Sequence, residues 1–106
     1  MLRPAAFALP LLLALAPAAG LARPQWVPLS ADGKCHANYN AIRKNGPIFV
    51  VPLSCDTEDA GKVAGESHIV CAAWSYFLVV EGRPAKAPGP IEKDSVAESA
   101  AYLVCK

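Results

Sequence analysis

Two histidines with nearby acidic and basic side chains are the residues that could carry acid–base chemistry. His36 and His68 could act as general acid and base on a phosphodiester, assisted by Glu66 and by Lys34 or Arg83. That set is typical of a secreted ribonuclease-like enzyme. Histidines at the starts of strands are more often surface residues, and no spacing in the chain brings these two together. We therefore expect no catalytic residues and keep a secreted nuclease or hydrolase as the main alternative.

Other arrangements that carry chemistry are incomplete. Glu66-Ser67-His68 is not a catalytic triad, because adjacent residues point apart on a strand and no G-x-S-x-G motif occurs. The acidic residues near it lack the order of a calcium-binding loop, and the cysteines lack C-x2-C spacing for zinc. We expect neither a metal site nor a cofactor.

Charge and length exclude several classes of function. The chain has 106 residues, a hydrophobic fraction of 54% and a formal net charge of +1. An apolar stretch at residues 1–22 inflates the hydrophobic fraction, and without it nine basic side chains balance nine acidic ones. This balance gives no field that would attract nucleic acid or anionic lipid. We expect one small domain that does not bind nucleic acid.

The N-terminal stretch is typical of a secretory signal peptide. Arg3 precedes an apolar run, Ala5 to Ala16, and small residues follow it up to Ala22. Cleavage after Ala22 is preferred over cleavage after Gly20. An uncleaved membrane anchor is the alternative, but Pro10 and Pro17 argue against a spanning helix. We predict a secreted, extracellular protein without stable membrane insertion.

All four cysteines follow the predicted cleavage site. An even number of cysteines in a short exported domain predicts two disulfides. The sequence alone leaves all three pairings open. For a domain of this size, the predicted bridges contribute a stabilisation comparable to the whole net stability.

The mature chain has the signals of a β-rich domain. Residues 23–33 are an expected extended lead-in, in which Trp26 and Val27 pack back, and residues 34–106 form the domain. Alternation predicts a strand over residues 34–42. The turn Asn45-Gly46-Pro47 precedes a second strand at 48–53, which Pro52 places at a sheet edge or a bulge.

The second half of the domain contains its most apolar segment. The run His68 to Val80 exceeds the usual strand length, so we expect two core strands that meet near residues 73–75. The polar segment before it, residues 56–67, is an expected surface loop or a short edge strand around residues 62–64. The proline-rich segment 85–90 is an expected loop.

The C-terminal segment has signals for both kinds of secondary structure. Ser95 and Glu98 have capping-box spacing, which predicts a short helix from Val96 toward Tyr102. The β-branched and aromatic residues of Ala101 to Cys105 favour a last strand instead. The two can also follow each other.

The domain resembles small secreted effectors of plant-pathogenic fungi, and within them the MAX group of avirulence and ToxB-like proteins. The similar features are Lys34-Cys35, the strands IFVVP and HIVCAAW, the piece SYFLVVEGRP and the terminal AYLVCK. The resemblance implies a disulfide-stapled antiparallel β-sandwich that binds a host protein. It also implies first-to-third and second-to-fourth bridges, Cys35–Cys71 and Cys55–Cys105.

These observations predict a mainly β, disulfide-stapled antiparallel sandwich with one short helix near the C-terminus. We interpret the protein as a monomeric, secreted virulence effector that binds a host protein inside or outside the host cell. A toxin-like antimicrobial module is a further alternative. Strand addition at an exposed edge is the expected binding mode. The candidate contact residues are Ile48, Val50, Lys62 and Val63.

Overall fold

A computed structural model describes residues 23–105 of the chain. The predicted signal peptide lies outside the described residues, as does Lys106. Seven strands, one 3-10 turn and one α-helix make up the described part. In chain order these are β1 (Trp26–Pro28), β2 (Cys35–Asn38), η2 (Tyr39–Ala41), β3 (Arg43–Asn45), β4 (Ile48–Thr57), β5 (Gly61–Val70), β6 (Ser75–Val80), β7 (Arg83–Pro90) and α2 (Val96–Val104).

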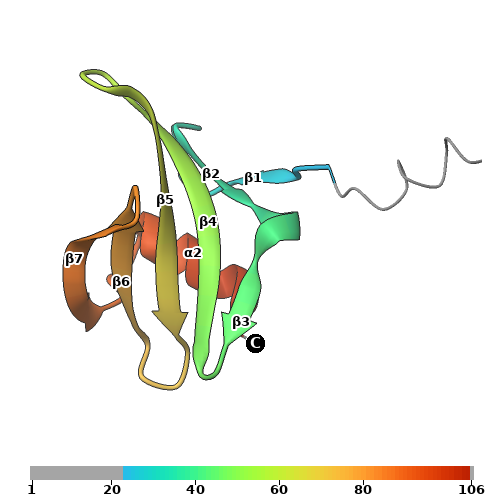
Figure 1. Cartoon of the computed structure of the whole chain (residues 1–106), viewed down its shortest axis with the longest axis vertical. Coiled ribbons are helices and arrows are strands. Elements are labelled where there is room, and N and C mark those ends of the chain that lie inside the picture. The colour runs from blue at the N-terminus through green and yellow to red at the C-terminus, as the bar shows by residue number, and fades with distance from the viewer. Residues whose placement is uncertain (1–22, 106) are drawn as a thin grey trace, which may run out of the picture.

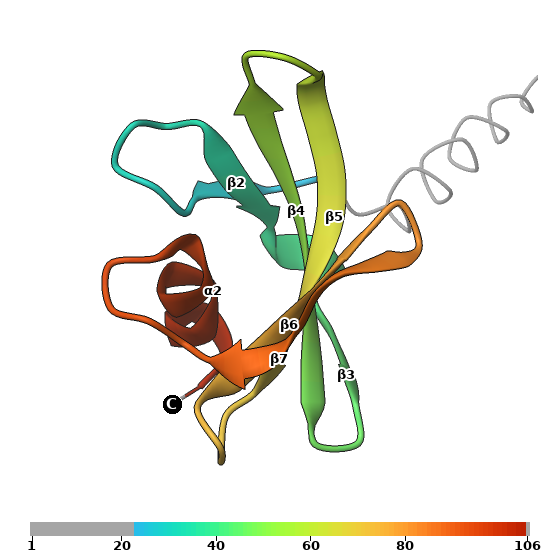
Figure 2. The same cartoon turned by 90° about the vertical axis from the view of Figure 1, so that its left-hand side faces the viewer.

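The seven described strands form one antiparallel sheet with the order β1-β2-β4-β5-β6-β7, and β3 also pairs with β4. The sheet is strongly twisted, and α2 lies against one side of it (Figures 1 and 2). The mainly β fold with a C-terminal helix and two disulfides is confirmed. The strands are joined in one sheet, and the helix takes the place that a second sheet has in a sandwich.

Strand β4 is central, so the expectation that residues 48–53 form an exposed edge is wrong. It pairs with β5 along its whole length. On its other side β3 pairs with residues up to Val50, and β2 pairs with residues from Leu53 onward. Pro52 lies in the gap between these two partners. A proline is tolerated there because one side of β4 has no partner strand at that position.

The polar segment before His68 is a turn at residues 58–60 followed by a long strand. The expected surface loop is therefore wrong for most of the segment, whereas the alternative of an edge strand around residues 62–64 agrees with the structure. β5 begins at Gly61, and the β4–β5 hairpin projects beyond the rest of the sheet (Figure 1). Thr57 closes the turn, because its hydroxyl donates to the Gly61 carbonyl at 2.8 Å and accepts from the Ala60 N–H at 3.0 Å. Lys62, Glu66 and His68 alternate along β5 with residues of the opposite face, which include the buried Ser67 and Ile69, so these polar side chains do not interrupt the strand.

The apolar run divides as predicted. β5 ends at Val70, a turn follows, and β6 begins at Ser75. The proline-rich segment after β6 is strand β7, where a loop was expected. β7 is an edge strand, so its prolines need no hydrogen-bond partner on the outer side. The pairing of β6 with β7 also shifts register between Tyr76 and Leu78 and between Leu78 and Val79, which accommodates the prolines within the ladder.

The predicted cap by Ser95 is confirmed, while Glu98 reaches back to the residue before the cap and not to Ser95 itself. The Ser95 hydroxyl accepts from the Glu98 N–H at 3.1 Å, and the Glu98 carboxylate accepts from the Asp94 N–H at 2.9 Å. The helix then continues to Val104, so no last strand forms. Its buried residues are all alanines: Ala97, Ala100 and Ala101. Small side chains let the helix lie close to the sheet, which favours helix over strand for this segment.

The hydrophobic core lies between α2 and one face of the sheet. Ala37, Val51 and Ile69 are fully buried there, and Leu29, Leu53 and Ile91 complete the cluster with the three helix alanines. We call this side of the sheet the covered face.

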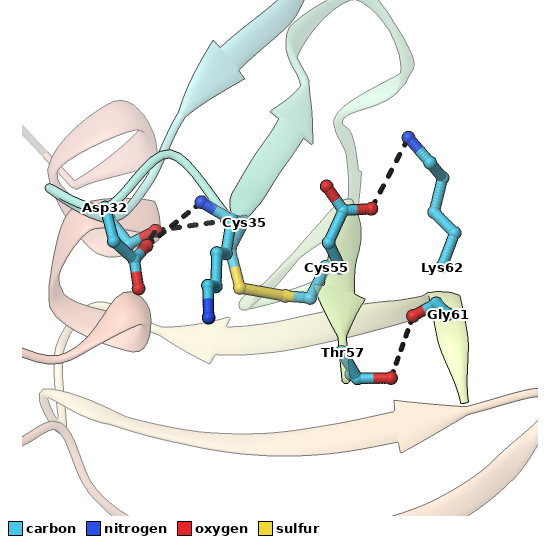
Figure 3. Close-up of a disulfide and its surroundings, with 9 residues drawn as sticks. Asp32, Cys35, Cys55, Thr57, Gly61 and Lys62 are labelled. Atoms are coloured by element: carbon cyan, nitrogen blue, oxygen red, sulfur yellow. Dashed lines mark hydrogen bonds and ion pairs between the residues drawn. A yellow bond between two sulfur atoms is a disulfide. The ribbon is translucent and has the colours of Figure 1, made fainter. Parts of the chain in front are cut away.

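The two disulfides join Cys35 to Cys55 and Cys71 to Cys105, and no described cysteine is free. The implied pairing of Cys35 with Cys71 and of Cys55 with Cys105 is therefore wrong. Cys35 lies directly opposite Cys55 across β2 and β4, with their Cα atoms 4.0 Å apart (Figure 3). The helix brings Cys105 back to the turn after β5, where Cys71 lies.

Candidate functional site

The face of the sheet opposite α2 is the candidate site, and we call it the open face. Within residues 23–105 no helix covers it (Figure 2). Residues directly opposite each other on neighbouring strands share a face. The register therefore places on the open face the side chains of His36, Arg43, Ser54, Ala64, Glu66, His68 and Phe77.

An ion-paired row crosses the open face from β3 to β6. The Arg43 guanidinium donates to Glu66 at 2.9 Å, and His68 Nε2 lies 3.1 Å from the other Glu66 carboxylate oxygen. The His68 ring stacks on Phe77 with ring centroids 4.5 Å apart. Val50 lies opposite both Arg43 and His68 and is only 3% exposed.

The carboxyl group of Glu66 in this row has a lowered pKa. The hydrogen bond from Arg43 lowers the pKa of Glu66, which outweighs the opposing effect of partial burial, and His68 adds to the lowering. The carboxylate is therefore ionised at neutral pH. It orients both the guanidinium and the imidazole.

The structure does not bring the two histidines together. Ser54 on β4 lies opposite both His36 on β2 and Ala64 on β5, and His68 is four residues further along β5 than Ala64. Two strand spacings and four residues separate the imidazoles by roughly 15 Å. A single phosphodiester cannot contact both. Of the two basic residues predicted to assist, Lys34 lies near His36, whereas Arg83 lies at the start of the edge strand β7.

Trp26 borders two adjoining hollows on the open face. Its side chain is on the edge strand β1 and is 51% exposed, so the expectation that it packs back into the domain is wrong. One hollow, of about 340 Å³, lies toward His36 and Lys62. The other, of about 430 Å³, lies over Pro52 and Val79. An exposed tryptophan beside a hollow is a common feature of recognition surfaces.

The four candidate contact residues differ in their exposure and in the face of the sheet on which they lie. Lys62 is exposed and lies on the open face, whereas Val63 is half-buried and points to the opposite side. Ile48 is half-buried. Val50 is buried beneath the ion-paired row, so a partner could reach it only through the residues above it.

The free edges of the sheet are poor sites for strand addition. β1 has three residues, β3 consists of Arg43, Lys44 and Asn45, and β7 contains three prolines. Short edges, charged edges and prolines all hinder pairing with another chain. Residues 61–64 of β5 extend past the end of β6 and have one unpaired side among the described strands. That segment is the remaining candidate edge.

Sequence reasoning missed Arg43 and assigned Phe77 to the core. Arg43 contacts a residue 23 positions away, and no local signal marks that contact. Phe77 is on the open face because β6 pairs with β5 in the register that places it opposite His68. Only the strand register shows that these residues belong to one site.

Two negative findings concern residues 23–105. In this range no three His, Cys, Asp or Glu side chains are grouped so that they could hold a metal ion. No helix in the same range is long and apolar enough to cross a membrane.

Comparison with protein families, with curated proteins and with solved structures gives no match to this chain.

Proposed function

We propose that this protein is an exported, disulfide-stabilised recognition protein that binds a partner protein through the open face of its sheet. The observation that carries the proposal is the contrast between the two faces. Helix α2 covers one face, while the other presents an exposed Trp26 beside a hollow. The partner is a host protein and the function that of a virulence effector, as for the proteins that the sequence resembles.

The side chains of the open face indicate which kind of partner segment the protein binds. An apolar side chain of the partner fills the hollow between Trp26, Pro52 and Val79. The Arg43–Glu66 pair beside it supplies one donor group and one acceptor group that orient the segment. A buried apolar anchor with a charged rim is the common energetic design of protein interfaces. This proposal depends on the open face and not on the disulfide pairing that the resemblance implied.

Site-specific photo-crosslinking tests which face binds. A photoreactive phenylalanine analogue replaces Ala64, which is exposed on the open face, or Tyr102, which is 61% exposed on α2. In host extract, the position-64 protein should form a specific adduct that the position-102 protein does not form. Trp26→Ala should abolish that adduct. Equal adducts at both positions, or an adduct that survives Trp26→Ala, would contradict the proposal.

An RNA cleavage assay addresses the enzymatic alternative. Under the proposal, purified oxidised protein leaves RNA intact. If the wild type cleaves RNA and the His68→Ala variant does not, the protein is a nuclease that uses one histidine, held by the Glu66–His68 pair, and the recognition proposal is contradicted.

A further inference from the structure

The end of the open face near β2 carries an alternating row of charges. Asp56 on β4 lies opposite Lys62 on β5, with 3.5 Å between Lys62 Nζ and the Asp56 carboxylate. On its other side, the Asp56 N–H donates to the Lys34 carbonyl at 2.8 Å, which places Lys34 across from Asp56. Lys34 makes no ion pair with any carboxylate of residues 23–105. Hydrogen bonds, and with them the Lys34 charge, lower the pKa of the neighbouring Asp32 carboxyl, so Lys34 has a counter-charge nearby but no direct ion pair. The row itself, Lys34, Asp56 and Lys62, holds two cations and one anion.

A second row with hydrogen-bonding groups lies beside the first. His36 is directly opposite Ser54, two residues along the strands from Lys34 and Asp56. Together with Trp26 these rows line the hollow of about 340 Å³. The hollow therefore combines one aromatic face, one hydroxyl, one imidazole and a net charge of one positive unit when His36 is neutral.

We propose that this hollow binds an acidic saccharide unit, such as a uronic acid. Its volume is at the lower end of small-molecule sites, which span about 300–1,000 Å³. The Lys34 ammonium, with Lys62, binds the carboxylate of the sugar. The Trp26 ring packs against the apolar face of the pyranose.

The acceptor groups in the hollow distinguish a sugar from a phosphate-bearing ligand. A saccharide presents several hydroxyl groups, which donate to the Asp56 carboxylate and exchange hydrogen bonds with Ser54 and His36. The same Asp56 carboxylate repels the multiple negative charge of a phosphate. One carboxylate beside two lysines therefore fits a ligand with a single negative charge and many hydroxyls.

Nuclear magnetic resonance titration of the oxidised protein tests this inference, with glucuronate, glucose and adenosine monophosphate as probes. Glucuronate should shift the Trp26 indole N–H and the amides of Ser54 and Lys62. Glucose lacks the carboxylate and should bind at least tenfold more weakly. Adenosine monophosphate should also bind more weakly than glucuronate.

Charge reversal with a matched control isolates the site. Lys34→Glu/Lys62→Glu should lower glucuronate affinity at least tenfold. Lys44→Glu/Lys86→Glu makes the same change in net charge at lysines that lie over the Phe49 and Tyr76 rings, away from the hollow, and should change affinity less than twofold.

Four results would overturn the saccharide site: absence of glucuronate binding, equal binding of glucose and glucuronate, tighter binding of adenosine monophosphate, or an equal loss in both charge variants. None of these results bears on the partner-protein proposal, because neither Lys34 nor Lys62 lines the hollow over Pro52 and Val79 that receives the apolar side chain of the partner.

Discussion

Removal of the Cys71–Cys105 disulfide should release α2 from the sheet. This bridge joins the turn after β5 to the end of the helix. The buried residues of the helix are three alanines, whose small side chains remove little apolar area from water, and Val96, Leu103 and Val104 are only partly buried against the same core. An isolated helix of nine residues is marginal in water. The variant Cys71→Ala/Cys105→Ala should therefore lose both helix and stability.

The magnitude follows from the length of the closed loop. A sequence separation of 34 corresponds to about 3.8 kcal/mol of loop-closure entropy at 25 °C. The separation of 20 for Cys35–Cys55 corresponds to about 3.3 kcal/mol. These values are too close for total stability to distinguish the two bridges. The location of the loss does distinguish them, because the β2–β4 ladder still holds the strands that Cys35 and Cys55 join.

Urea unfolding and amide hydrogen exchange measure the two parts of this prediction. Cys71→Ala/Cys105→Ala should lose exchange protection at Ser99, whose N–H donates to the Ser95 carbonyl within α2. The control variant Cys35→Ala/Cys55→Ala should keep that protection. The reasoning is refuted if the first variant retains a protected helix and loses less than about 1 kcal/mol.

Three further changes have expected outcomes in urea unfolding. Ser95→Ala removes the cap on the Glu98 N–H and should destabilise by about 1 kcal/mol, whereas an unchanged midpoint would show the cap to be unimportant. Glu81 has a φ of 52° in the turn between β6 and β7, so Glu81→Asn should stabilise by about 0.5–1 kcal/mol, and a loss would contradict this turn conformation. Because Arg43 lowers the pKa of Glu66, the pair stabilises the fold above the unfolded pKa of the carboxyl, and this stabilisation disappears as pH falls through the folded pKa. Glu66→Gln should therefore cost at most about 1 kcal/mol at pH 7 and nothing near pH 2, and a constant difference would disprove the linkage.

Local signals in the sequence predicted the local features of the fold. Ser95 and Glu98 are three residues apart, and their capping interaction needs no other part of the chain. The turn at Gly46, with a φ of 62°, and the break between Val70 and Ser75 are equally local. Propensity and turn chemistry act over a few residues, so these predictions are confirmed.

Features that depend on the partners of a strand could not be predicted. Pro52 indicates an edge or a bulge, but it lies in a central strand at the gap between two partners. Prolines in β7 indicate a loop, but an edge strand tolerates them. The pairing of Cys35 with Cys55 and the contact of Arg43 with Glu66 both follow from strand register. Register is a property of the whole sheet, and so the candidate site emerged only from the structure.

Disulfide mapping of the protein recovered after secretion tests the central claim most directly. That claim is an exported, cross-linked sheet with α2 fastened over one face and the other face left to bind. Digestion without reduction, followed by mass spectrometry, should recover peptides joined through Cys35–Cys55 and through Cys71–Cys105. Peptides joined through Cys35–Cys71 and Cys55–Cys105, or four free thiols, would contradict the account.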